Sequence, residues 1–208
     1  MKTVLCFGDS NTWGYEPGTG RRHGHDVRWP GVLRRKLGTD YHIVEEGLNG
    51  RTTVLDDPTR FAKNGMTYFR PCLDSHAPID LLILMLGTND MKHRFGLSPF
   101  DIAAGIGMLL SIVPQLGCGP DGAMPKLLIM APPHLGPFSV LAELFAGAEP
   151  KSRAYADQLR LFAQQYGASF FDTSEVVAVS SVDGVHFDAE NHRKLGERVA
   201  ELVLHILA

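Results

Sequence analysis

Two short motifs near opposite ends of the chain supply the side chains that acyl transfer through a serine requires. Gly8–Asn11 reads Gly-Asp-Ser-Asn, and Asp183–His186 reads Asp-Gly-Val-His. Ser10 is the candidate nucleophile, His186 its base, and Asp183 the carboxylate that orients the imidazole. An aspartate three positions before a histidine on one bent loop can reach one ring nitrogen. The other nitrogen then remains free to take the serine proton.

Each of these residues also has an ordinary structural explanation. Ser10 follows an apolar run, where a serine often caps a helix. Asp183 and His186 could form an exposed loop pair with no partner. The two motifs together favour the nucleophile and its base over these alternatives.

Two further polar segments can supply hydrogen-bond donors for a developing oxyanion. Asn89 offers a side-chain amide, and Gly50 offers a backbone N–H that no side chain covers. With the N–H of Ser10 they would form a three-donor oxyanion hole. Their segments, Gly87–Asp90 and Asn49–Gly50, also have the composition of turns. Asp90 is interpreted as a local turn or helix-cap residue.

Apolar runs that are typical of buried strands alternate with longer helical patterns. The expected strands are Thr3–Phe7, Tyr41–Glu45, Leu81–Leu86, Leu127–Ala131 and Ser169–Phe171. The expected helices are Trp29–Leu37, Pro99–Val113, Lys151–Tyr166, Ala189–Leu207 and a short one at Phe138–Gly147. Such alternation predicts an α/β fold, with a parallel sheet and helices on both faces.

This arrangement predicts where the polar segments meet. Ser10, Asn49–Gly50, Gly87–Asp90 and Asp183–His186 all follow expected strands. Because functional groups of open α/β sheets collect beyond the carboxyl ends of the strands, all four segments should share one rim. No repeat, low-complexity tract or linker interrupts the chain, so residues 1–208 are expected to form one domain.

Composition limits the remaining function classes. The 208 residues, 44% hydrophobic and 21% charged, are typical of a globular protein with a sizeable core. A net charge of −3 gives no basic footprint for nucleic acid. No stretch was expected to reach the roughly 18 apolar residues of a membrane span, and the segment before Asp9 is too short for a signal peptide. We therefore expect a cytoplasmic protein that binds neither nucleic acid nor a membrane.

No cofactor is expected. The three cysteines (Cys6, Cys72 and Cys118) form no paired motif, so neither a disulfide framework nor a zinc site is predicted. The His23–Asp26 segment contains two histidines without helical spacing or further ligands, and it is interpreted as a solvated loop.

The four polar segments, in this order, resemble the SGNH (GDSL-type) serine hydrolase superfamily over nearly the whole chain. The resemblance implies a three-layer, flavodoxin-like fold with a five-stranded parallel sheet in the order 2-1-3-4-5. It also implies Ser10, His186 and Asp183 as catalytic residues, and Ser10, Gly50 and Asn89 as oxyanion donors. The family usually has Leu where this chain has Asn11.

Longer segments are similar to the bacterial arylesterase/acyltransferase branch. They are Gly8–Gly14, Glu46–Thr53, Leu86–Lys92 and Ala131–Pro133. This implies hydrolysis of small acyl esters, and in some members transfer of the acyl group to alcohols or peroxide. Gly50 stands where the acyltransferase type has Ala. Some members of the branch are homo-oligomers, and homo-oligomerisation is expected here.

Apolar residues near these segments are candidates for the substrate pocket or for ordinary packing. Trp13, Met91 and Phe138 are the pocket candidates, with Trp29 and Phe145 as further ones. The apolar, proline-rich segment 131–148 is interpreted as a lid or an oligomer contact.

Two other functions remain open. A carbohydrate O-acetylesterase would use the same three catalytic residues on acetylated sugars. A flavodoxin-like binding module would need a phosphate-binding loop after the first strand, where Asp9 would repel a phosphate.

Overall fold

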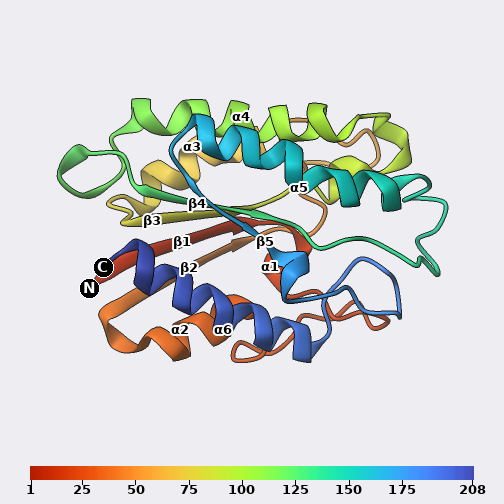
Figure 1. Ribbon diagram of the computed structural model, residues 1–208, viewed down its shortest axis with the longest axis horizontal. Helices are drawn as coiled ribbons and strands as arrows, with labels where there is room; N and C mark the ends of the chain where they lie inside the picture. Colours follow the sequence, from red (N-terminus) through yellow and green to blue (C-terminus); the bar gives the residue numbers. More distant parts are fainter.

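The computed structural model describes residues 1–208 as a parallel sheet between two layers of helices (Figure 1). The five strands pair in the order β2-β1-β3-β4-β5, which confirms the expected flavodoxin-like topology. Their bounds are β1 Lys2–Gly8, β2 Tyr41–Gly47, β3 Leu81–Met85, β4 Lys126–Ala131 and β5 Ser169–Asp172.

The helices divide between the two faces of the sheet (Figure 1). One face carries α2 (Trp29–Leu37) and α6 (Ala189–Ile206), and the other carries α3 (Gly65–His76), α4 (Pro99–Leu116) and α5 (Ala148–Gln165). A single-turn helix, α1 (Ser10–Trp13), follows β1.

The sequence of the central strand β1 is apolar without alternation because both of its faces are covered by helices. Val4 and Cys6 lie in the core beneath α2 and α6, whereas Leu5 and Phe7 lie in the larger core beneath α3, α4 and α5. From Val4 to Phe7 each strand residue is therefore buried on one face or the other, as in sheets covered on both sides. Cys6, Cys72 and Cys118 are free and buried.

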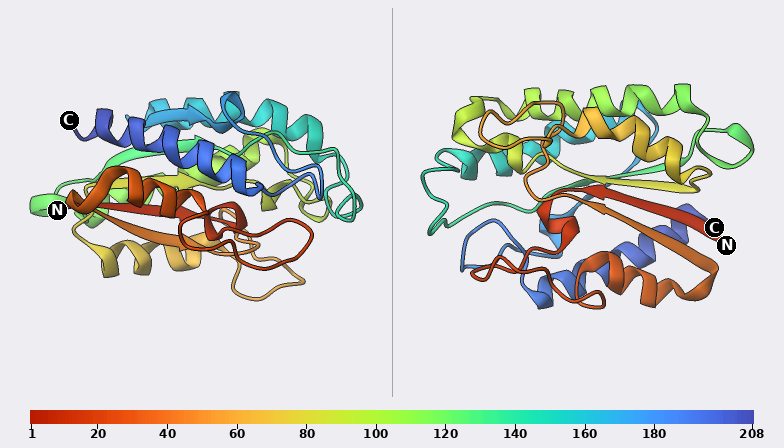
Figure 2. Two further views of the ribbon diagram at one scale, coloured as in Figure 1. Left: turned by 90° about the horizontal axis from the view of Figure 1, so that it is seen from below. Right: turned by 180° about the vertical axis from the view of Figure 1, so that it is seen from behind.

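The strand register brings the polar segments to one rim. Gly8 at the end of β1 lies opposite Gly47 of β2 and Met85 of β3. The three segments that follow these strands therefore leave the sheet at the same level. The loops gather at this end of the molecule, and both termini lie at the other end (Figure 2).

Helix α3 was not predicted from the sequence. Asn64 caps its start by accepting from the N–H of Met66, and Pro71 lies within it. Phe69, Cys72 and Leu73 form its buried side, with the spacing of a helical face. Gly65 and Pro71 both disfavour a helix interior, so they hide this short pattern.

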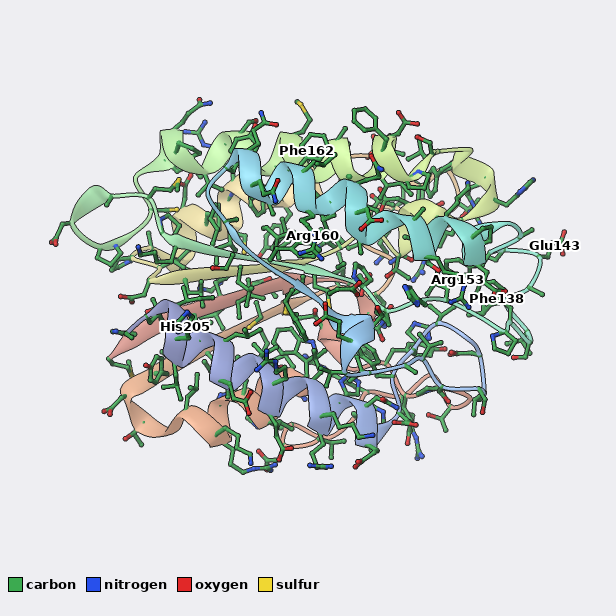
Figure 3. All side chains as sticks on the ribbon, viewed as in Figure 1. Phe138, Glu143, Arg153, Arg160, Phe162 and His205 are labelled. Atoms are coloured by element: carbon green, nitrogen blue, oxygen red, sulfur yellow. The ribbon has the colours of Figure 1, made fainter.

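The helix expected at Phe138–Gly147 is wrong, because this segment forms turns. The carbonyl of Leu144 accepts from the N–H of His93 at 2.9 Å, and Gly136 N–H donates to Gly184 O at 2.8 Å. The segment is thus attached to neighbouring loops, and its own bonds, such as that from the N–H of Phe145 to the carbonyl of Leu141 at 3.0 Å, close separate turns rather than a continuous helix. Phe138 and Glu143 lie at the loop-bearing end of the molecule, and His205 lies toward the termini (Figure 3).

One helix meets the length and composition of a membrane span, contrary to the expectation from the sequence. Over Pro99–Leu116 the mean hydropathy is 1.4, and 44% of the residues are buried within the protein. Ile102, Ile106 and Leu109 of this helix belong to the larger core. A core helix satisfies the same criteria, so the absence of membrane binding stays a prediction.

Candidate active site

Ser10, His186 and Asp183 form one chain of hydrogen bonds at the rim of the sheet. Nε2 of His186 lies 3.0 Å from Oγ of Ser10, and Nδ1 of His186 lies 2.7 Å from Oδ2 of Asp183. All three residues are buried. The structure thus brings together side chains that lie 176 positions apart in the sequence.

The second oxygen of Asp183 fixes the loop around the histidine. It accepts from the backbone N–H groups of Val185 at 2.9 Å and His186 at 3.0 Å. Burial alone would raise the pKa of Asp183, but hydrogen bonds from the His186 ring and from these amides outweigh it and lower the pKa. The carboxylate is therefore ionised and able to stabilise an imidazolium.

Ser10 is positioned by the sharp passage from β1 into α1. Asp9 caps the helix by accepting from the N–H of Asn11 at 2.9 Å. A Cβ atom on Gly8 would lie 2.1 Å from Oγ1 of Thr12, so only glycine allows this turn of helix to fold back against the strand end. The nucleophile candidate is thus held at the edge of the sheet.

Asn11 attaches the serine turn to the histidine loop. Its Nδ2 donates to the carbonyl of Val185 at 3.1 Å, and its Oδ1 accepts from the N–H of Phe187 at 3.1 Å. These two backbone groups flank His186 on either side. The sequence marked Asn11 only as a departure from the family pattern, whereas the structure makes it a link between the two motifs.

The expected oxyanion donors Gly50 and Asn89 line the same cavity as Ser10 and His186. Gly50 has a φ of +84°, which favours glycine, and its N–H donates to no backbone oxygen. Asn89 donates one N–H of its amide to the carbonyl of Arg51 at 3.1 Å, which orients the group. Its second N–H remains for a ligand.

Asp90 joins the segments after β2 and β3, rather than serving only a local turn as the sequence suggested. It accepts from the N–H of Thr53 at 3.0 Å and from the Thr53 hydroxyl at 2.6 Å. Burial raises the pKa of Asp90 to about 7, although the hydrogen bonds from Thr53 lower it. Asp90 thereby fixes the segment that carries Gly50 relative to Asn89.

Tyr15 is a site residue that the sequence analysis missed. Its ring stacks on that of His186, with centroids 4.1 Å apart and planes inclined by 28°. It follows Gly14, whose φ of +91° ends α1 and turns the chain back over the site. No sequence pattern marks it, because its position depends on this turn.

The cavity beside Ser10 has a volume of about 190 Å³. It is lined by Ser10, Tyr15, Asn49, Gly50, Arg60, Asn89, Lys92, Arg94, Leu141, Leu144, Phe145, Val185 and His186. The apolar side chains come mainly from the segment 141–145, and the basic ones come from two separate loops.

Trp13, Met91 and Phe138 do not line this cavity, which corrects their assignment to the substrate pocket. Met91 is buried in the larger core, and Trp13 lies beneath the guanidinium of Arg22. Phe138 stacks against Phe145 at 5.8 Å, and it is Phe145 that reaches the cavity. The further candidate Trp29 is fully buried in the core beneath α2 and α6.

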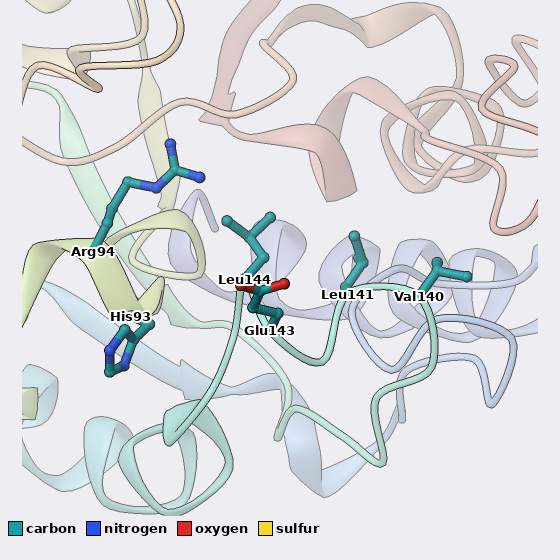
Figure 4. Close-up of a pocket in the computed structure, with 6 residues that line it drawn as sticks. All are labelled: His93, Arg94, Val140, Leu141, Glu143 and Leu144. Atoms are coloured by element: carbon teal, nitrogen blue, oxygen red, sulfur yellow. The ribbon is translucent and has the colours of Figure 1, made fainter.

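A second cavity, of about 460 Å³, adjoins the first at Arg94, Leu141 and Leu144 (Figure 4). A third, of about 320 Å³, shares Tyr15 and Leu141 with the first. Leu141 therefore lines all three cavities and separates the space beside Ser10 from its surroundings.

Outside the candidate active site, one group of side chains has the composition of a metal site. The ligand atoms of Glu46, Cys72 and His76 lie within 4.8 Å of one another. Glu46 already pairs with His76 at 2.9 Å. Burial and the nearby charge of Glu46 raise the pKa of the Cys72 thiol to about 12, which disfavours the thiolate that a metal requires.

Comparison with known proteins identifies the relatives of the chain. The profile of the GDSL-like lipase/acylhydrolase family matches residues 6–194. An inhibitor-bound aryl esterase from M. smegmatis is 41% identical over 100% of both chains, with a TM-score of 0.95. A carbohydrate acetylesterase from Sinorhizobium meliloti is 39% identical over 99% of both chains, also with a TM-score of 0.95.

A second carbohydrate acetylesterase family member from S. meliloti is 40% identical over 100% of this chain and 99% of its own, with a TM-score of 0.93. No curated protein sequence matches the chain. Because the family profile covers most of the sequence and these structures align from end to end, the chain belongs to the GDSL-like lipase/acylhydrolase family of carboxylic ester hydrolases.

Proposed function

We propose that the chain is a serine esterase that hydrolyses small, short-chain acyl esters, aryl esters among them, through an acyl-serine intermediate. The observation that carries the proposal is the hydrogen-bonded chain Ser10–His186–Asp183 at a cavity that Gly50 and Asn89 also line. The M. smegmatis relative, described as an aryl esterase, supports the substrate class.

The first half of the reaction forms the acyl-enzyme. His186 takes the proton of Ser10 as Oγ bonds to the ester carbonyl carbon. The oxyanion accepts hydrogen bonds from Gly50 N–H, Asn89 Nδ2 and Ser10 N–H. The C–O bond to the alcohol then breaks, and the imidazolium gives its proton to that leaving oxygen.

The second half releases the acid. A water molecule loses a proton to His186 as its oxygen bonds to the acyl carbon, and the returning proton restores the Ser10 hydroxyl. Asp183 stabilises the imidazolium in both halves. An alcohol in place of water would give acyl transfer, which should be seen as a new ester when an alcohol is added in excess.

Removal of the Ser10 hydroxyl tests the nucleophile. The Ser10→Ala variant should lose turnover of phenyl acetate and labelling by a fluorophosphonate, while its circular dichroism and melting temperature stay close to those of the parent. Ser111→Ala, at a half-buried position on α4 outside the cavity, is the matched control and should retain both. Undiminished turnover by Ser10→Ala would reject the mechanism.

The S. meliloti relatives make carbohydrate O-acetylesterase the second candidate function. The small cavity favours compact esters over polymers. Acetate release from phenyl acetate, from an acetylated monosaccharide and from acetylated xylan separates the two. A clear preference for either sugar substrate would replace aryl esters as the substrate class.

We also infer that the chain self-associates through the segment 131–148. Val140 in this segment is 89% exposed, and neighbouring Leu141 lies at the junction of three cavities. Sedimentation velocity at micromolar concentration should detect an oligomer, and Val140→Asp should weaken it. A monomer under these conditions would contradict the inference.

A further inference from the structure

Three cations line the candidate active-site cavity. They are Arg60, Lys92 and Arg94, and none of the 13 lining residues is an acid. Arg60 comes from the loop after β2, and the other two come from the segment after β3. A neutral ester needs no such charge, so the cations require an explanation beyond the hydrolysis itself.

One carboxylate, that of Asp57, neutralises part of this charge. Asp57 pairs with Lys92 at 3.4 Å and with Arg94 at 3.1 Å. Burial alone would raise the pKa of Asp57, but hydrogen bonds from Thr59 and the charges of the two cations lower it to about 2. Two cations therefore share a single negative charge. The side chain of Arg94 extends away from Glu143 (Figure 4), and it makes no ion pair with that residue.

Arg60 has no acidic partner within 4.0 Å. Its guanidinium covers Gly50, since a Cβ atom added to Gly50 would lie 2.6 Å from Nη1 of Arg60. The unpaired charge therefore lies next to one of the oxyanion donors, at the reacting end of the cavity.

The lowered pKa values of two neighbouring lysines are consistent with an excess of positive charge around this cavity. Burial lowers the pKa of Lys92, the charge and hydrogen bond of Asp57 raise it, and the charges of Arg60 and Arg94 lower it again by smaller amounts. Burial also lowers the pKa of Lys63, again with a contribution from Arg60. Crowding like charges is unfavourable, and an anion bound among them would relieve it.

The cavity is also lined by apolar side chains, those of Leu141, Leu144, Phe145 and Val185. A ligand that matches both kinds of lining has a short apolar body and one anionic group. A guanidinium forms a two-pronged pair with a carboxylate, which gives orientation as well as attraction.

We propose that this site selects esters that carry a carboxylate, which Arg60 binds next to Gly50 with support from Arg94 and Lys92. The inference rests on the proposed esterase function and names its substrate class. The carboxylate could belong to the acyl group, as in a half-ester of a dicarboxylic acid, or to the departing alcohol, as in an acylated hydroxybenzoate.

Two matched pairs of substrates test the proposal and separate these sources. Mono(4-nitrophenyl) succinate is compared with its neutral methyl ester, and 4-acetoxybenzoate with 4-acetoxybenzamide. The native protein should favour the anion of at least one pair by about tenfold in kcat/KM, the effect of one charge-assisted hydrogen bond. Added 0.5 M NaCl should reduce this preference.

Arg60→Gln should lower the anion-to-neutral ratio of that pair by about tenfold, again the worth of one charge-assisted hydrogen bond. Because each ratio compares two esters in the same variant, general damage to the site cancels. Arg70→Gln, at an exposed position on α3, removes the same charge outside the cavity and should leave the ratio unchanged. Equal rates within both pairs, or a ratio that Arg60→Gln does not alter, would overturn the inference.

A binding measurement distinguishes this failure from a failure of the esterase function. Calorimetry on Ser10→Ala should detect 4-hydroxybenzoate or succinate, and the added Arg60→Gln change should abolish the signal. Hydrolysis of neutral aryl acetates without any anion preference would overturn the inference alone. Arg60-dependent binding without hydrolysis of any ester by the native protein would overturn the esterase function alone. If neither binding nor hydrolysis is detected, both the esterase function and the preference for a carboxylate are overturned.

Discussion

The reacting side chains depend on neighbours that lie far from them in the chain. Asp183 orients His186 from within one loop, whereas Ser10 reaches the same ring from the end of β1. Tyr15 covers the ring by stacking, which restricts how far it can rotate. The geometry at Ser10 is therefore set by several contacts rather than by the two motifs alone.

Asn89 is expected to act through its free amide hydrogen. Asn89→Ala removes a donor to the oxyanion and should lower kcat for phenyl acetate by about 10²–10³-fold, the range for loss of one such donor. KM should change much less, because the hydrogen bond strengthens in the transition state. A loss below about threefold, far outside that range, would argue against the role.

Asp90 should make stability depend on pH. In the unfolded chain its carboxyl ionises near 3.8, and in the folded protein near 7. The folded protein therefore holds the additional proton between these values. The contribution of Asp90 to stability is complete below pH 3.8 and is lost as the pH rises through 7. Between these values the free energy of unfolding should fall by up to about 1.4 kcal/mol per pH unit.

Asp90→Asn keeps the shape and an acceptor for Thr53 but cannot ionise. Urea unfolding of both proteins from pH 4 to pH 8 measures the effect. The variant should gain stability relative to the parent as the pH rises and should change little above pH 7. Parallel curves over the whole range would show that Asp90 titrates normally.

At the scale of elements, α1 and the loop before α6 behave as one unit because Asn11 bonds to both sides of His186. Asn11→Ala would leave the buried carbonyl of Val185 and N–H of Phe187 without partners. At about 1–3 kcal/mol for each of the two unpaired groups, the free energy of unfolding should fall by about 2–6 kcal/mol.

Chemical denaturation and phenyl acetate kinetics, measured together, test this link. Activity should fall along with stability, since His186 loses its support from α1. Gln164→Ala, which truncates an exposed amide on α5, should alter neither. An Asn11→Ala protein as stable as its parent would show that the two bonds contribute nothing.

Buried strands were predictable because their apolar runs are uninterrupted. All five expected strands occur, each differing from the observed one by at most two residues at an end. Helix α3 was hidden by Gly65 and Pro71. The turns at 138–147 have helical spacing but close only separate turns, and His93 of another loop donates to the carbonyl of Leu144.

The candidate site was predictable only in part, because some of its residues follow no local sequence pattern. Ser10, His186 and Asp183 are recognisable by residue type and by their place after strands. Arg60 and Tyr15 reach the cavity through loop paths that no local pattern encodes. The same holds for Phe145, which lines the cavity where Phe138 was expected.

At the scale of the whole molecule, the size of the cavity should set the range of acyl chains. About 190 Å³ beside Ser10 accommodates a short chain, and Leu141 separates this space from two adjoining cavities. In a series of 4-nitrophenyl esters, kcat/KM should be highest for the shortest chains. Leu141→Ala should shift the maximum to longer ones, because it opens the wall between the cavities.

Rates of acetate, butyrate, hexanoate and decanoate esters give the profile for both proteins. Ala142→Gly, a truncation of an exposed neighbour, is the control and should keep the native profile. Rising activity of the native protein beyond about eight carbons would contradict the estimate of available space, since each further methylene needs its own room in the cavity.

The attachment of the segment 138–147 has a consequence for how relatives of this protein can diverge. The reacting groups are carried by the helix turn after β1 and by the loop before α6, whereas part of the cavity wall is carried by a loop that meets neighbouring loops through a few backbone bonds. Insertions or replacements in that loop would change which molecules enter without rebuilding the machinery that cleaves them. New substrate preferences can thus arise on an unaltered catalytic frame.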